Sequence, residues 1–110
     1  MKGQKVKLVV FVPPTHVEAV LRAMGDAGAG KIGNYDYCTY SSVGVGRFLP
    51  KEGANPTVGQ VGKLEEVEEI KIETICEKNL ITKVIEAVKK VHPYEEAPFD
   101  VYLLLEVTKL

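Results

Sequence analysis

The chain has 110 residues, a length that suits one domain with a single core and no separate catalytic module. Apolar residues make up 45% of it and charged residues 26%, as in an ordinary globular protein. The net charge of −1, with acids and bases interleaved, excludes the broad positive field that draws nucleic acid or an anionic membrane. We therefore expect one domain over residues 1–110, with no nucleic-acid and no membrane partner.

The expected location is the cytoplasm. The short apolar run at residues 6–12 lacks the flanks of a signal peptide, and no segment reaches the roughly 20 apolar residues that span a bilayer. Cys38 and Cys76 fit no Cys-x-x-Cys spacing and lie in expected strands. We interpret them as small buried side chains in a reducing compartment.

The first part of the chain predicts a strand followed by a helix. Residues 5–12 are rich in Val and Leu, which favours a buried strand. Thr15 and Glu18 have the spacing of a capping box, which satisfies free amide groups at a helix start. Gly25 and Gly28 predict the helix end. The helical stripe that faces the core comprises Val17, Val20, Leu21 and Met24.

The middle of the chain predicts two strands joined by a loop. Residues 35–49 are rich in Tyr, Thr and Val, and Gly44 and Gly46 predict a bend or bulge there. Residues 65–77 have one apolar and one charged face, so this strand is expected to be partly solvated. The Gly- and Pro-rich residues 50–62 between them are expected to form a mobile loop. The apolar face of the later strand carries Ile70, Ile72, Thr74 and Cys76.

The last part predicts a second helix and a closing strand. Asn79 suits the helix cap, and Pro93 requires the helix to end by His92 because the residue before a proline avoids helical geometry. Phe99 opens an alternating strand that continues to Val107. The apolar stripe of this helix comprises Ile81, Val84, Ile85 and Val88.

The order β-α-β-β-α-β predicts an α+β ferredoxin-like fold, with two helices on one face of a four-stranded antiparallel sheet. The two central strands are longer than so small a sheet needs. We expect them to project as a hairpin, and because an isolated two-stranded ribbon is marginal in water, to pair with a second copy of the chain. The expected partner is thus a homo-oligomer.

Two nucleotide-binding patterns in the sequence lack the required context. Residues 28–33 spell Gly-x-Gly-x-x-Gly, but they follow a helix and precede a strand, the reverse of a dinucleotide fingerprint. Residues 25–31 approach a P-loop spacing, but Ile32 stands where a hydroxyl would meet Mg²⁺. We interpret this stretch as a flexible connection between helix and strand.

The segment 92–100 concentrates the chemistry of the chain. His92, Tyr94, Glu95 and Glu96 lie within five residues at a helix-to-strand junction. Imidazole with carboxylates suits Zn²⁺ or Mn²⁺, so His92, Glu95 and Glu96 are candidate ligands of a divalent metal ion. The same residues also suit a stiff turn and a subunit contact, and a helix C-terminus favours an imidazolium at His92. Metal binding, structure and catalysis all stay open.

His16 is the other histidine. It is expected in the first turn of the first helix, at the opposite end of the helical layer from His92. On that arrangement the two histidines could meet only across a subunit contact. Tyr35 belongs to a group of tyrosines that the sheet can expose, and it is a further candidate for a ligand or interface contact.

Many spaced residues carry a family resemblance. They are the run 28–35, Cys38, Gly44-x-Gly46-x-Phe48-x-Pro50, Gly53-Ala54-x-Pro56-x-x-Gly59, Gly62, Glu65-Glu66-Val67, Glu73 and the closing His92-Pro93-Tyr94-Glu95-Glu96-x-Pro98. Together they resemble the inserted domain of the NIF-three-like (YqfO/YbgI-type) family and its stand-alone bacterial versions. The resemblance implies a ferredoxin-like fold related to the PII and CutA proteins, and trimers built by sheet-edge and hairpin contacts.

The resemblance does not extend to a reaction. In the full-length family a dinuclear metal site is formed by the flanking domain, and some relatives are labelled GTP cyclohydrolase homologues. Nothing in this chain matches the part that would support that activity. The chain also departs from the usual pattern at Ala97 and at Thr39-Tyr40, both mild changes.

Two functions of different class follow. The first is a non-enzymatic, trimeric PII/CutA-like module that binds a protein partner, a small-molecule ligand or a metal ion at subunit clefts. The second is a metalloprotein or hydrolase-type enzyme that uses the cluster at residues 92–96, where crowded carboxylates could serve acid-base chemistry. No catalytic residue is assigned. The ligand or interface candidates are His92, Tyr94, Glu95, Glu96, His16 and Tyr35.

Overall fold

The computed structural model describes residues 3–107. Two helices and four strands follow in the predicted order, and a short 3₁₀ turn precedes each helix. The elements are β1 (Lys5–Val12), η1 (Pro14–His16), α1 (Val17–Asp26), β2 (Thr39–Phe48), β3 (Glu65–Glu77), η2 (Lys78–Leu80), α2 (Ile81–Lys89) and β4 (Phe99–Leu103).

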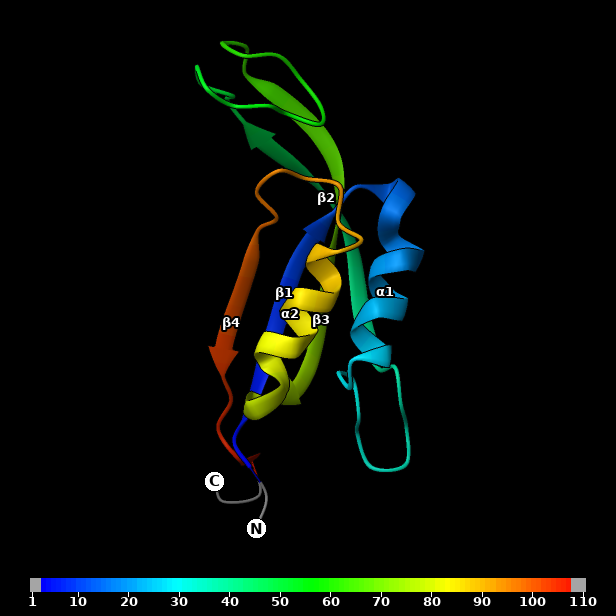
Figure 1. Cartoon of the computed structure of the whole chain (residues 1–110). Helices are drawn as coiled ribbons and strands as arrows, with labels where there is room; N and C mark the ends of the chain where they lie inside the picture. Colours follow the sequence, from blue (N-terminus) through cyan, green and yellow to red (C-terminus); the bar gives the residue numbers. More distant parts are fainter. Residues whose placement is uncertain (1–2, 108–110) are drawn as a thin grey trace.

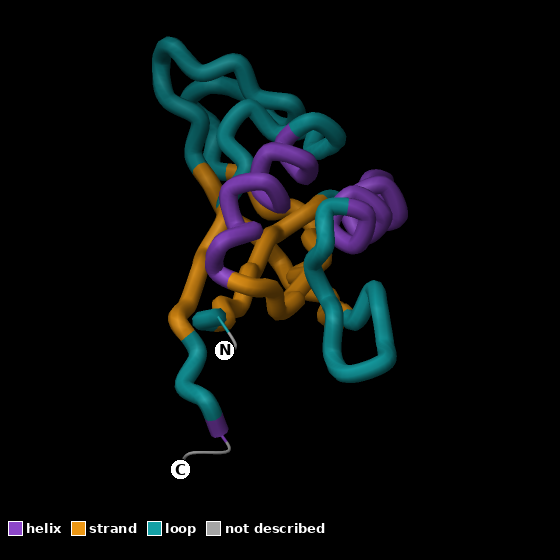
Figure 2. The backbone as a smooth tube through the Cα atoms, turned by 60° about the horizontal axis from the view of Figure 1, so that its bottom comes forward, coloured by secondary structure: helices purple, strands orange, loops and turns teal. Residues whose placement is uncertain are grey.

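The strands form one antiparallel sheet in the order β2-β3-β1-β4. Both helices lie side by side on one face of this sheet, as Figures 1 and 2 show from two directions. The predicted ferredoxin-like fold is therefore confirmed. The bounds of β1 and β3 agree with the prediction to the residue.

The core lies between the helices and the sheet face that they cover. The predicted stripes are confirmed, because Val20 and Met24 of α1 and Val84 and Val88 of α2 are fully buried. Cys76 is buried among them as predicted, whereas Cys38 is only half-buried, and both thiols are free. The sheet contributes to this core Val6, Leu8, Val10, Val12, Ile72 and Cys76.

The predicted helix caps are wrong. Neither helix has a side-chain hydrogen bond at its N-cap, because each begins from a 3₁₀ turn that contains the expected capping residue. Thr15 lies inside η1, and its Oγ1 instead forms a 2.8 Å hydrogen bond with Nδ1 of His16. Asn79 likewise lies inside η2.

The glycine-rich connection explains why β2 begins at Thr39 and not at residue 35. The amide of Gly30 donates to the carbonyl of Ile75 at 2.7 Å, and its own carbonyl accepts from the amide of Cys38 at 2.9 Å. A Cβ atom on Gly30 would come within 2.6 Å of the Cys38 nitrogen. Tyr37 has a φ of 58°, which breaks the strand geometry just before β2.

The central hairpin projects beyond the rest of the domain, as predicted. β1 pairs with β3 only from Ile70 to Glu77, so the first five residues of β3 pair with β2 alone. The molecule is accordingly elongated, with extents of 50 × 27 × 24 Å (Figure 1).

The two ends of the described chain meet at the opposite end of the sheet (Figure 1). The amide of Leu104 donates to the carbonyl of Lys5 at 3.0 Å, and Nε2 of Gln4 donates to the carbonyl of Leu104 at 2.6 Å. Within residues 3–107, no helix has the length and apolar character needed to span a bilayer.

Candidate functional site

His92 links the end of α2 to the end of β1. Its Nδ1 accepts a 3.1 Å hydrogen bond from the amide of Tyr94, so the ring hydrogen is assigned to Nε2. Nε2 then donates to the carbonyl oxygen of Phe11 at 2.8 Å. Both ring nitrogens are thus satisfied by backbone groups, and the side chain is 8% exposed. This arrangement fixes the neutral imidazole as a structural link.

The predicted imidazolium at His92 is wrong. Burial lowers the pKa of the His92 imidazole, and the nearby His16 lowers it further, which outweighs the opposing effects of the Phe11 carbonyl and of Glu69. The predicted separation of the two histidines is also wrong. β4 runs antiparallel to β1, so the end of α2 and the start of α1 lie at the same end of the helical layer (Figure 1).

The loop over residues 50–62 rests on the segment that follows His92. The amide of Asn55 donates to Oε1 of Glu95 at 3.0 Å, and Oγ1 of Thr57 donates to the carbonyl of Pro93 at 2.7 Å. A 2.7 Å bond from the Gly62 amide to the Pro50 carbonyl closes the base of the loop. Glu95 is therefore an anchor of this loop, which has defined contacts where mobility was predicted.

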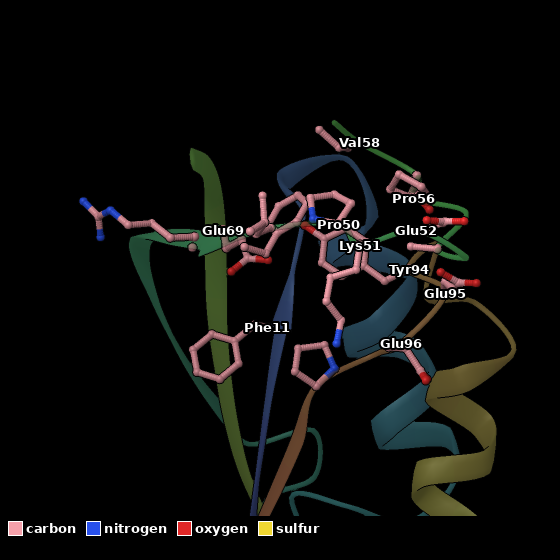
Figure 3. A pocket seen from close by; sticks show the side chains of 17 residues that line it. Phe11, Pro50, Lys51, Glu52, Pro56, Val58, Glu69, Tyr94, Glu95 and Glu96 are labelled. Carbon is pink, nitrogen blue, oxygen red and sulfur yellow. The ribbon is translucent and has the colours of Figure 1, made fainter. Parts of the chain in front are cut away.

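A cavity of about 670 Å³ lies under this loop, at the base of the projecting hairpin (Figure 3). We name it the loop pocket. Its walls come from four parts of the chain: the end of β1, the hairpin strands, the loop, and the segment 94–98. The lining residues are Phe11, Gly46, Arg47, Phe48, Leu49, Pro50, Lys51, Glu52, Ala54, Pro56, Thr57, Val58, Glu69, Tyr94, Glu95, Glu96 and Pro98.

Glu69 and Tyr94 form a polar pair in this largely apolar cavity. Burial raises the pKa of the Tyr94 hydroxyl well above its ordinary value, and the hydrogen bond and negative charge of Glu69 raise it further. The Tyr94 hydroxyl thus keeps its proton at neutral pH and donates a hydrogen bond to Glu69. Figure 3 shows the side chains of Glu69 and Lys51 reaching into the cavity from β3 and from the loop.

A glycine on β2 makes room for the Glu69 carboxylate. Glu69 pairs with Gly44 in the sheet register, and Gly46 lies diagonally beside it. A Cβ atom on Gly46 would collide with Oε1 of Glu69, whereas one on Gly44 would meet open space. The predicted bend at these glycines is absent, because the β2–β3 ladder continues through both. Gly46 instead lets Glu69 lie across the strand.

The structure brings together only part of the predicted cluster. Tyr94, Glu95 and Glu96 line the loop pocket, whereas His92 lies beside it as a structural link and His16 lies outside its lining. Tyr35 lies in the connection before β2, where it is 73% exposed and exchanges two 2.9 Å backbone hydrogen bonds with Ile32.

Sequence reasoning missed Phe11, Phe48, Lys51 and Glu69 as pocket residues. For Glu69 the available signal was the pair of glycines on β2. In an antiparallel sheet, glycines on one strand leave room for a long side chain on the neighbouring strand. For the predicted metal set, the described residues contain no group of three or more His, Cys, Asp or Glu side chains arranged to hold an ion. Metal binding through His92, Glu95 and Glu96 stays a prediction.

Similarity to known proteins extends over nearly the whole chain. No family model matches it. It is 57% identical over 98 residues to a protein of Halalkalibacterium halodurans named GTP cyclohydrolase 1 type 2 homolog, covering 89% of this chain and 26% of that protein. It also superimposes on the crystal structure of a Bacillus cereus protein related to NIF3, with a TM-score of 0.85 and 52% identity, covering 96% of this chain and 27% of the other. The chain is a homologue of one domain of the NIF3-related proteins. It spans about a quarter of the length of the curated relatives that it matches.

More distant structures share only the fold of this NIF3-related domain. The Bacillus subtilis GlnK–ATP complex matches with a TM-score of 0.65 at 21% identity, covering 94% of this chain and 84% of that one. CutA of Archaeoglobus fulgidus matches with a TM-score of 0.69 at 13% identity, covering 93% and 85%. The predicted relation to the PII and CutA folds is thus confirmed.

Proposed function

We propose that the domain is a non-enzymatic, homo-oligomeric binding module of the cytoplasm, and that its loop pocket holds a small organic ligand. The observation that carries this proposal is the loop pocket itself. Its volume of about 670 Å³ lies within the range of small-molecule sites, about 300–1,000 Å³. Its apolar walls and few inward polar groups are also typical of such sites.

The side chains of the pocket favour binding over catalysis, because its hydroxyl groups are already engaged by other groups of the protein. Among the described residues that line it, none is a Ser, Cys or His. The hydroxyl of Thr57 is bonded to a backbone carbonyl, and the hydroxyl of Tyr94 interacts with Glu69.

The proposed cytoplasmic location is supported by the two cysteines, which are free thiols as expected in a reducing compartment.

Assembly is supported by the surface that the helices leave uncovered. Tyr40 on β2 and Tyr102 on β4 stand on the helix-free sheet face with 69% and 54% of their surface exposed. Val43 and Val45 lie on the other face of β2, toward the projecting hairpin, and are 72% and 57% exposed. Val43 and Val45 are neighbours on one face of an edge strand, and exposed apolar side chains in such a place are typical of subunit contacts. The trimer is the assembly that the relation to PII and CutA proteins implies.

A pocket-filling substitution tests the proposal. Ala54 lines the loop pocket and is half-buried, whereas Ala19 is exposed on α1. We expect Ala54→Phe to abolish chemical-shift changes that a screen of small aromatic fragments produces at residues 46–58 and 94–98. Ala19→Phe is the matched control and should bind the same fragments unchanged. Fragments that bind Ala54→Phe as well as the parent protein, or no binding fragment at all, would refute the pocket.

A further inference from the structure

We propose that the ligand of the loop pocket is an organic cation, an amine joined to an apolar or aromatic body. This inference rests on the proposed function and specifies its ligand class. Three observations favour a cation: the fixed carboxylate of Glu69, the aromatic side chains that line the pocket, and the excess of carboxylates over cationic side chains in its lining.

Glu69 is the anchor for the cationic group. It stands on β3 at the base of the projecting hairpin, where that strand pairs with β2 alone, and is half-buried at the wall of the cavity. Gly46 supplies the space in which its carboxylate lies, and the Tyr94 hydroxyl donates a hydrogen bond to it. A carboxylate that is held on a rigid element before the ligand arrives loses little freedom on binding, so an ammonium ion gains more from it.

Aromatic walls add to the attraction for a cation. Phe11, Phe48 and Tyr94 all line the cavity and are half-buried. The faces of such rings attract an ammonium group electrostatically. The same rings and the neighbouring Pro50 and Pro98 give an apolar body a surface to bury.

The charge of the lining disfavours an anion. Four carboxylates line the loop pocket, those of Glu52, Glu69, Glu95 and Glu96, against the two cationic side chains of Arg47 and Lys51. Nε of Arg47 is already 3.1 Å from Oε1 of Glu66, which lies outside the lining. Lys51 is on the exposed loop, whereas Glu69 is fixed in the sheet. A ligand rich in phosphate would meet net repulsion here.

Three probes with one aromatic body and different charge test the ligand class. They are 2-phenylethylamine, 2-phenylethanol and 3-phenylpropionate, titrated into the isotopically labelled 110-residue chain at neutral pH, with ATP as a fourth probe. We expect the amine to shift resonances of residues 46–58, 69 and 94–98 with a Kd of about 1 mM, and the anion to bind about tenfold more weakly.

Matched variants identify the carboxylate. Glu69→Gln should weaken amine binding about tenfold, whereas Glu68→Gln, on the same strand but outside the pocket lining, should leave it unchanged. Lys51→Ala should strengthen amine binding, because it removes a competing cation. If 3-phenylpropionate or ATP binds the pocket as tightly as the amine, or if Glu69→Gln binds the amine normally, the ligand class is wrong while the pocket stands. If no probe shifts pocket resonances, the proposed function falls as well.

Discussion

Nε2 of His92, at the end of α2, donates a 2.8 Å hydrogen bond to the carbonyl oxygen of Phe11, at the end of β1. The residues are 81 positions apart in the chain. Through this bond the helical layer is tied to the sheet at the rim of the loop pocket.

Removal of the His92 ring should therefore destabilise the domain. His92→Ala leaves the part-buried carbonyl of Phe11 without its donor and opens a void, so we expect a loss of about 2–4 kcal/mol in the free energy of unfolding. Urea denaturation measures it. His16→Ala is the control and should cost much less, because among the described residues the His16 ring has a hydrogen bond to its neighbour Thr15 alone. Equal losses for the two variants would contradict the structural role of His92.

The stability of the domain should fall when the pH drops through the titration range of histidine. Burial holds the pKa of folded His92 below its ordinary value. The unfolded chain therefore binds a proton first, near pH 6.5, and the contribution of neutral His92 is lost from about that pH downward. Urea midpoints for the parent chain and His92→Gln, measured between about pH 5 and pH 8, isolate this effect. The stability of the His92→Gln variant should depend less on pH than that of the parent chain. A parent chain that gained stability relative to the variant as the pH fell would refute the assignment.

Two glycines of one strand should respond differently to the same substitution. Gly46→Ala places a methyl group against the Glu69 carboxylate and should lower stability by about 1–2 kcal/mol while weakening ligand binding. Gly44→Ala meets open space and should be neutral or slightly stabilising, since alanine restricts the unfolded chain. Denaturation of both variants decides the point. A Gly44→Ala variant that loses as much as Gly46→Ala would show that the space around Glu69 is not what matters.

A charge on the projecting hairpin should separate subunits without unfolding them. Val45 lies directly opposite Glu68, so Val45→Lys can form a cross-strand ion pair that preserves the hairpin. We expect the mass measured by sedimentation equilibrium to fall toward that of one chain, whereas Val45→Ile should keep the parent mass. A parent chain that is already monomeric at micromolar concentration would refute the homo-oligomer.

The parts of the fold that local pattern determines could be predicted from the sequence. The bounds of β1 and β3 follow from their apolar residues, and the helical stripes follow from i, i+3, i+4 spacing. The start of β2 was wrong because residues 35–38 have strand-like composition, but Cys38 is bonded to the carbonyl of Gly30, and Gly30 is in turn bonded to Ile75, which is distant in sequence. The helix caps failed for a similar reason, since capping spacing does not reveal a 3₁₀ turn.

The candidate site could be predicted only in part. Tyr94, Glu95 and Glu96 were found because they are adjacent in sequence. Glu69 joins them only through the register of β3 against β2. Phe11 arrives through the pairing of β1 with β3 and β4, which no spacing in the sequence specifies. A pocket built from four separate segments is a property of the folded sheet.

The hydrogen bond from Gln4 to Leu104 holds the first and last described segments of the chain together. The chain enters the sheet at the start of β1 and leaves it at the end of β4. These two points are adjacent and lie at the end of the sheet farthest from the loop pocket. The domain can therefore be inserted into a longer chain through one attachment point. This agrees with its match to about a quarter of the length of a longer relative. Whatever is joined at that point leaves the mouth of the pocket and the projecting hairpin free to meet a ligand and a neighbouring subunit.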